Sequence, residues 1–321
     1  MKGILKLSVA AVLSLVFTAS LVYASLQIPE MVDNILNLFL IDAPDIQRVD
    51  DLRLIGYVSF SATWLLILAG FLTKRSKLST SGSILSILPI FGYFATYMFF
   101  LAGIGVIRIF WVPLMDLSPN ILKLGHIVYI PYLLIELLAT PVHLAYTWPS
   151  LLSYPLSLIV TRIGLLIFSF STITWLYGRF RGLNIIDFWI YRYSRHPQYL
   201  GFLLWSYGML HQGTIEYPPG GRYVPPPSLP WLISAITIIG VALYEERIMI
   251  SNKDVVYAKY RDSTSFIIPL PKQLSSIVTA PMKFLMKKSL PETRKEIFYM
   301  MILYCFLLIL FSLPLVWILP F

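Results

Sequence analysis

The chain has little of what soluble enzymes use for chemistry. Its 321 residues include one cysteine, four histidines and 16 acidic residues, and charged residues make up only 13% of the total. The single cysteine, Cys305, excludes an internal disulfide and has no partner for a zinc–thiolate site. The sequence has no glycine-rich phosphate loop, no His-Glu-x-x-His zinc motif and no Gly-x-Ser-x-Gly nucleophile elbow. We therefore predict no metal site, and the commonest motif-defined classes of nucleotide-binding protein and hydrolase are excluded.

The residues that are abundant are apolar ones. Hydrophobic residues make up 57% of the chain, and apolar runs of about 20 residues, the length that crosses a bilayer as a helix, recur along it. This pattern predicts an all-α, polytopic transmembrane helix bundle, and hence a multi-pass integral membrane protein. The net charge of +9 lies mostly at the ends of these runs. We attribute it to helix orientation and contact with membrane lipids, not to nucleic acid.

Charged flanks and prolines divide the apolar runs. The acidic stretch 26–52 predicts a non-cytoplasmic loop, and the arginine-rich stretch 178–198 predicts a cytoplasmic one. Residues 121–148 contain two prolines, Glu136 and His143, which predicts a broken segment that dips into the membrane, with the glutamate as a functional candidate. The predicted spans are 4–24, 54–72, 84–107, 155–177 and 297–319, and residues 199–210 and 231–244 form the arms of a hairpin.

Cations and tyrosines gather in one stretch, Tyr191–Gly201, which reads Tyr-Arg-Tyr-Ser-Arg-His-Pro-Gln-Tyr-Leu-Gly. Pro197 has a fixed φ and no backbone N–H, so it suits the first turn of a helix. Arg195 and His196 would then lie at the N-terminal mouth of that helix, where free backbone N–H groups favour anions. The plainer interpretation is a positive cytoplasmic flank with interfacial tyrosines, which many membrane proteins have.

A second polar cluster, Glu245-Glu246-Arg247, follows the other arm of the hairpin and precedes an amphipathic segment at 248–262. The proline- and glycine-rich residues 217–227 predict the hairpin turn. Because a hairpin brings its two ends to the same face, His196 and the two glutamates should be neighbours. Such a pocket suits S-adenosylmethionine: Arg195 or His196 would face its carboxylate, and a glutamate would face its ammonium or ribose hydroxyls.

The two motifs together resemble the signature of the isoprenylcysteine carboxyl methyltransferase and phospholipid methyltransferase superfamily. The likeness covers roughly residues 155–272, with Trp189-Ile190 where the family has Gly-Pro and Lys253-Asp254 where it has Phe-Gly. The place of an arginine typical of the prenylcysteine enzymes falls within 241–244, which holds none. The second motif is in register at Glu245-Glu246, Ile248, Tyr257-x-x-Tyr260-Arg261 and Ile268-Pro269.

The chain is predicted to have three parts: N-terminal transmembrane helices at 1–150, which resemble no family, a core at 151–272 that the resemblance makes methyltransferase-like, and a linker with a last transmembrane helix at 273–321. In the core, the hairpin and a cytoplasmic amphipathic tail helix would form the cofactor pocket. The predicted cofactor contacts, which include two residues from the charge argument (Arg195 and Glu246), are Leu183, Asn184, Ile185, Ile186, Tyr191, Arg195, His196, Pro197, Gln198, Tyr199, Glu245 and Glu246.

The implied activity is S-adenosylmethionine-dependent methyl transfer to a lipophilic small molecule: a prenylated carboxylate, a lipid amine or a quinone-like acceptor. A carboxylate acceptor needs no base, whereas an amine or phenol acceptor could use His196, Glu246 or a tyrosine, so the catalytic residue stays unassigned. Two alternatives stay open. One is an NADPH-dependent enzyme like the membrane sterol reductases, which carry Arg-His-Pro-Asn-Tyr where this chain has Gln198. The other is a non-catalytic, lipid-binding membrane protein.

Overall fold

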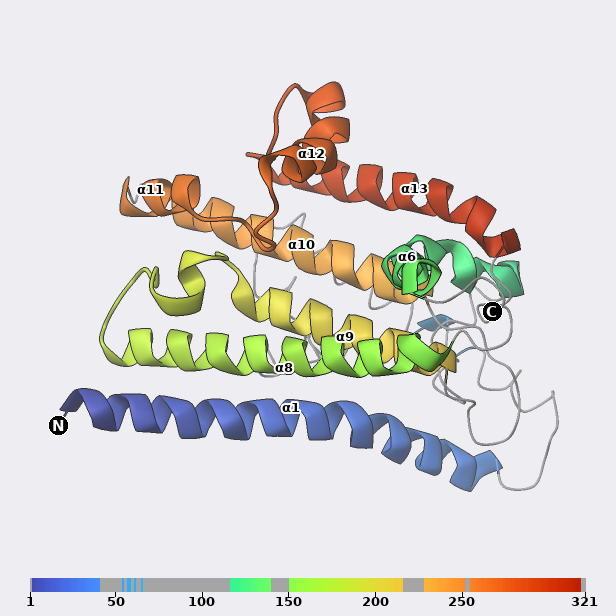
Figure 1. The fold of residues 1–321 in the computed structure, drawn as a ribbon, viewed down its shortest axis with the longest axis horizontal. Coiled ribbons are helices and arrows are strands. Elements are labelled where there is room, and N and C mark those ends of the chain that lie inside the picture. The colour runs from blue at the N-terminus through green and yellow to red at the C-terminus, as the bar shows by residue number, and fades with distance from the viewer. Residues whose placement is uncertain are drawn as a thin grey trace. The chain divides into compact units, whose positions relative to one another are not determined.

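We analysed a computed structural model of the chain, which describes residues 2–40, 54, 57–58, 61, 65, 116–139, 150–215, 228–251 and 255–318. The regular structure in these ranges is all helical, with no strand among them, which confirms the all-α prediction. Figure 1 shows the helices, which are α1 (Lys2–Leu40), η2 (Pro119–Tyr129), α6 (Ile130–Ala139), α8 (Ser150–Phe180), η3 (Trp189–Arg192), α9 (Pro197–Ile215), α10 (Ser228–Ser251), α11 (Val255–Ser263), α12 (Lys272–Met286) and α13 (Arg294–Ile318).

Four stretches within these helices are long and apolar enough to cross a membrane: Gly3–Tyr23, Pro155–Phe180, Ser228–Ile250 and Arg294–Ile318. They coincide with the predicted spans 4–24, 155–177 and 297–319 and with the second arm of the hairpin. The predicted span 84–107 lies outside the described residues, as do most of 54–72 and the hairpin turn at 217–227.

Two predicted irregular regions are helical instead. The helix α1 continues to Leu40, so the loop predicted from residue 26 is wrong for residues 26–40. The sequence there has few acidic residues, interspersed with leucines and other good helix formers, and such residues can continue a helix whatever their charge. The linker predicted after residue 272 contains α12, whose apolar residues follow the helical period.

The predicted break within 121–148 is confirmed in its first half. The 3-10 helix η2 gives way to α6 at Ile130, next to Pro131, which cannot donate a backbone hydrogen bond. The dip into the membrane stays a prediction. The Glu136 side chain and all of His143 lie outside the described part of the chain.

The chain divides by contacts into two compact units, which we describe separately. One consists of Met1–Ala19, Leu158–Gly208 and Ile233–Leu307, and the other of Ser20–Ser157, Met209–Leu232 and Leu308–Phe321. The three-part division along the sequence stays a prediction. Both polar motifs belong to the first unit, whereas the second contains a buried contact in which His126 Nδ1 lies 2.8 Å from Ser228 Oγ.

Small residues set the helix packing in the first unit. Ser14 of α1 donates to the Ser169 carbonyl of α8 at 2.7 Å. Along α8 and α9, Gly164 faces Trp205 and Gly201 faces Phe168, and a Cβ on Gly201 would lie 2.5 Å from the Phe168 backbone nitrogen. The two helices therefore pack backbone to backbone, as membrane helices with small residues do. This antiparallel packing fixes where the first turn of α9 lies.

Candidate functional site

The site begins where the chain enters α9. Pro197 is the first residue of this helix, as predicted. Just before it, the Arg195 backbone N–H donates to the Ser265 carbonyl at 2.9 Å, and the His196 N–H donates to the Phe266 carbonyl at 3.2 Å. The segment after α11 is thus joined through its main chain to the mouth of α9.

The side chain of Arg195 connects the same mouth to the end of α10. Its Nε lies 2.6 Å from Glu246 Oε1 and its Nη2 lies 3.2 Å from Oε2, a bidentate pair between two buried side chains. Its Nη1 donates to the carbonyl of Thr264 at 2.7 Å and to that of Arg261. One guanidinium therefore holds together α9, α10 and the tail that follows α11.

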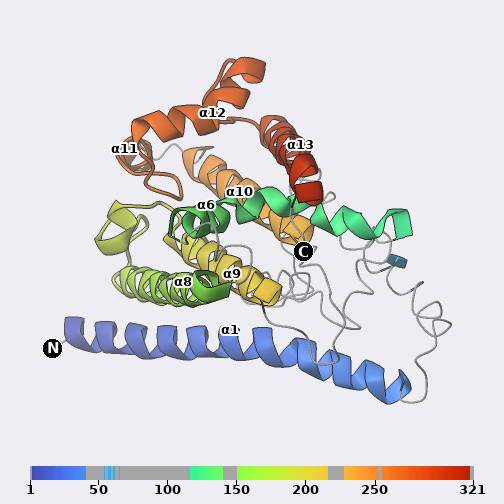
Figure 2. The same cartoon turned by 45° about the vertical axis from the view of Figure 1, so that its right-hand side comes forward.

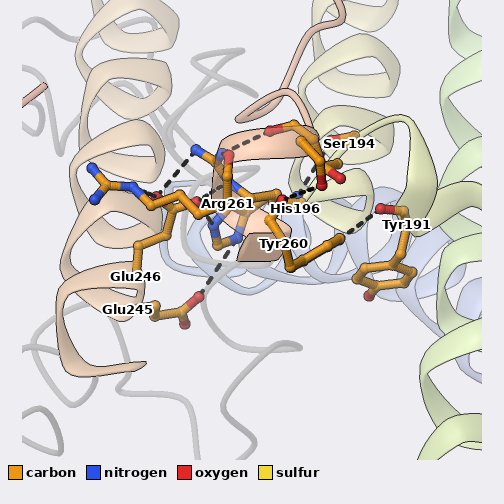
Figure 3. Close-up of polar contacts among 10 residues, drawn as sticks. Tyr191, Ser194, His196, Glu245, Glu246, Tyr260 and Arg261 are labelled. Carbon is orange, nitrogen blue, oxygen red and sulfur yellow. Dashed lines mark hydrogen bonds and ion pairs between the residues drawn. The ribbon is translucent and has the colours of Figure 1, made fainter. Parts of the chain in front are cut away.

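His196 faces both glutamates (Figure 3). Its Nε2 lies 3.2 Å from Glu246 Oε1, and its Nδ1 lies 3.9 Å from Glu245 Oε2. The imidazole stacks on Tyr199 with 5.6 Å between ring centroids, and the Tyr199 hydroxyl donates to Glu245 Oε1 at 2.9 Å. The prediction that the two ends of the hairpin meet is therefore confirmed.

The two adjacent glutamates differ in their surroundings. The side chain of Glu246 is 3% exposed and is surrounded by Arg195, His196 and, at 3.8 Å, the Nε of Arg261. The side chain of Glu245 is 41% exposed and contacts Tyr199 and His196. Glu246 is therefore a buried carboxylate held by its protein partners. Glu245 is partly exposed, and its oxygens can accept further hydrogen bonds from outside the protein.

The tail segment contributes residues that the sequence analysis used only to align the second motif. The Tyr260 hydroxyl donates to the Tyr191 carbonyl at 2.6 Å, as drawn in Figure 3. Burial raises the pKa of both phenols above its ordinary value, so each stays neutral near pH 7. The spacing Tyr257-x-x-Tyr260-Arg261 was the signal that could have added Tyr260 and Arg261 to the predicted site. Ser194, whose hydroxyl accepts from the His196 N–H, lies within the first motif but was not among the predicted contacts.

Other predicted contacts lie apart from this charged cluster. The Gln198 amide donates to Thr172 Oγ1 of α8 at 3.4 Å. The Leu183 N–H donates to the Gly178 carbonyl, and Ile186 is buried against Gly178 at the end of α8. Asn184 is exposed and Ile185 is half-buried. Within the described residues, no hydrogen bond or ion pair joins the stretch 183–186 to the glutamates.

Trp189 stands where the resembled methyltransferase superfamily has glycine, and its backbone conformation is one that suits glycine. Trp189 has a φ of 50°, the left-handed conformation that side chains disfavour. Its ring stacks on Tyr177 at 5.5 Å between centroids and meets Phe188 edge-on at 5.2 Å. These aromatic contacts offset the backbone cost at the start of η3, which carries the buried Tyr191 toward the tail.

Comparison of the chain with protein-family models, with curated proteins and with solved structures gave no match. The class of site is therefore defined by its own chemistry. It is a buried Arg–Glu pair with a histidine, a partly exposed glutamate and neighbouring tyrosines, all at the meeting point of two apolar helices.

Proposed function

We propose that the protein is a membrane-embedded, S-adenosylmethionine-dependent methyltransferase that acts on a lipophilic acceptor. The observation that carries the proposal is the approach of His196 to Glu245, at 3.9 Å, with Tyr199 bonded to the same carboxylate. These residues come from the two motifs that resemble the methyltransferase superfamily and lie 46 to 49 positions apart in the chain. The four long apolar helices support the membrane location.

The donor set fits the charges of this methyl donor. Glu245 and Tyr199 would hold its ammonium or ribose hydroxyls, because they combine a partly exposed carboxylate with a hydroxyl. Arg261, whose side chain is 25% exposed, is better suited to its carboxylate than Arg195, whose donors engage Glu246 and two carbonyls. In this proposal Arg195 positions the site and does not touch the ligand.

The chain's own part in the reaction is alignment. S-adenosylmethionine supplies a methyl group on a sulfonium sulfur, and the carbon–sulfur bond breaks with its electron pair staying on sulfur as the acceptor bonds to carbon. Because this group is already activated, holding both partners in line and excluding water supplies most of the rate, and alignment can contribute about 7–11 kcal/mol. The buried Arg195–Glu246 pair keeps the tail against α9 and α10, which is the arrangement that such alignment needs.

Calorimetric titration of the detergent-solubilised protein with S-adenosylmethionine tests the proposal. Glu245→Ala should weaken affinity roughly 10- to 100-fold, the effect of losing one hydrogen bond to a charged group. His196→Ala should weaken it similarly, because the imidazole holds Tyr199 and Glu245 in position. Glu292→Gln, which alters an exposed ion pair near the start of α13, is the matched control and should bind normally. Wild-type protein that binds NADPH but not S-adenosylmethionine would overturn the assignment in favour of the reductase class.

The acceptor is found by mass spectrometry of host lipids and quinones with and without the gene. Loss of the gene should deplete a species and accumulate a partner lighter by one CH2 group. Label transfer from radiolabelled S-adenosylmethionine into a lipid extract provides the direct assay. A protein that binds the donor but leaves every lipid unlabelled would be a binding protein and not a transferase.

A further inference from the structure

The helix α12 has an uncovered apolar face. Phe284 is 87% exposed and Ile277 is 66% exposed, and they lie seven positions apart, two turns along the same side. Leu274, Val278 and Leu285 continue this face and are also exposed. A cluster of large exposed apolar side chains on one helix marks a contact surface for an apolar partner.

Other sides of α12 are polar or held by the protein. Ser276 and Thr279 bond back to carbonyls of their own helix. Met282 is buried, and the Tyr304 hydroxyl of α13 donates to the Val278 carbonyl. The helix is thus attached to α13 through a backbone carbonyl, while the apolar side chains of its face stay exposed.

Cations flank this face near the start of the last long apolar helix. Lys283, Lys287 and Lys295 are exposed, whereas Lys288 is paired with Glu292 at 2.6 Å and with Glu296 at 3.3 Å. Only residues 287–293 connect α12 to α13. If α13 spans a bilayer, the end of α12 therefore lies on the same side of that bilayer as the start of α13. Figures 1 and 2 show α12 running across the direction of α13, as expected for a helix in the membrane plane.

We propose that α12 lies in the interface of an anionic phospholipid bilayer, with its apolar face among the acyl chains and its lysines at the headgroups. A surface helix with a large apolar face and lysines beside it has the chemistry of such an interfacial helix. The exposed lysines favour a lipid surface over a second copy of this chain, because two identical cationic rims would repel each other. The inference rests on membrane insertion of α13 and is independent of methyl transfer.

The test uses the full chain with its only cysteine replaced, as Cys305→Ser, and reconstituted in vesicles. A polarity-sensitive fluorophore is attached at Phe284→Cys on the apolar face, at Ser276→Cys as the matched polar control, and at Phe306→Cys on exposed α13. In vesicles of phosphatidylcholine with phosphatidylserine, lipid-borne spin labels should quench the fluorophore at 284 and at 306, but not at 276. Aqueous iodide should give the reverse order.

The headgroup contact is tested by Lys283→Gln with Lys287→Gln in the Phe284→Cys background. On anionic vesicles, the ratio of lipid-buried to water-exposed fluorophore should fall by about fivefold per lysine, and on neutral vesicles it should not change. Equal iodide access at 284 and 276 would overturn the proposal, as would shielding at 284 that follows protein concentration and not lipid. A fluorophore at 306 without lipid quenching would refute the insertion of α13, whatever the methyl-transfer assays show.

Discussion

Glu246→Gln should destabilise the fold far more than the same change at the neighbouring Glu245. The Glu246 carboxylate takes two hydrogen bonds from the buried guanidinium of Arg195 and lies 3.2 Å from His196. An amide in its place keeps one acceptor oxygen but turns an NH2 group toward cationic donors and leaves a buried charge uncompensated. Breaking such a pair by changing one partner costs about 3–5 kcal/mol.

The expected shift is large enough to measure by thermal unfolding. For a chain of 321 residues, each kcal/mol moves the midpoint by about 1.5 °C, so Glu246→Gln should lower it by roughly 4–8 °C. Glu245→Gln keeps an oxygen that can accept from Tyr199 and loses mainly the charge beside His196, so it should lower the midpoint by no more than about 2 °C. The eight tryptophans allow intrinsic fluorescence of the detergent-solubilised protein to follow the transition.

A double variant separates the loss of the charge pair from a simple packing effect. Arg195→Met combined with Glu246→Leu removes both charges and keeps the apolar volume, so it should recover most of the stability that Glu246→Gln loses. If Glu246→Gln unfolds at the same temperature as Glu245→Gln, the buried pair does not hold the three segments together. The assignment of structural and ligand-facing roles to the two glutamates would then be wrong.

Three further changes probe the surroundings of the site. Gly201→Ala should prevent the close packing of α9 on the Phe168 backbone and sharply lower the yield of folded protein, whereas Gly3→Ala, with open space around it, should have no effect. Trp189→Ala should be less stable than Trp189→Gly by about 1 kcal/mol in chemical unfolding, because only glycine relieves the left-handed backbone. Tyr260→Phe should cost about 1 kcal/mol below pH 10. Because burial raises the pKa of the Tyr260 phenol, wild-type stability should fall as the pH rises above about 10, and this variant should lose less.

The sequence was sufficient for the helical class and for the meeting of the two motifs. Runs of apolar residues need helices to satisfy their backbone in lipid, and a short proline-rich connection brings two such helices back to one face. Proline at position 197 likewise predicted the start of α9, because its ring suits only the first turn. These features depend on local chemistry that can be read from consecutive residues.

Other features depend on contacts between residues that are distant in the chain, and a single sequence does not show which of these residues meet. The motif alone did not distinguish the roles of Glu245 and Glu246, because their burial depends on the tail that packs over one of them. Arg195 was expected to bind ligand, and only its bonds to Glu246 and to carbonyls of the tail indicate a positioning role. The extent of α1 and the presence of α12 were missed because acidic or proline-containing stretches can still be helical when their other residues favour it.

The hydrogen bonds from the backbone of residues 195 and 196 to the carbonyls of Ser265 and Phe266 have an evolutionary consequence. Main-chain atoms are the same in every amino acid, so mutation can replace either acceptor residue while the hydrogen bond persists. These two hydrogen bonds can therefore persist while the amino-acid sequence around them diverges widely. Distant relatives are therefore better sought by superposing the backbone around these four residues than by aligning sequences.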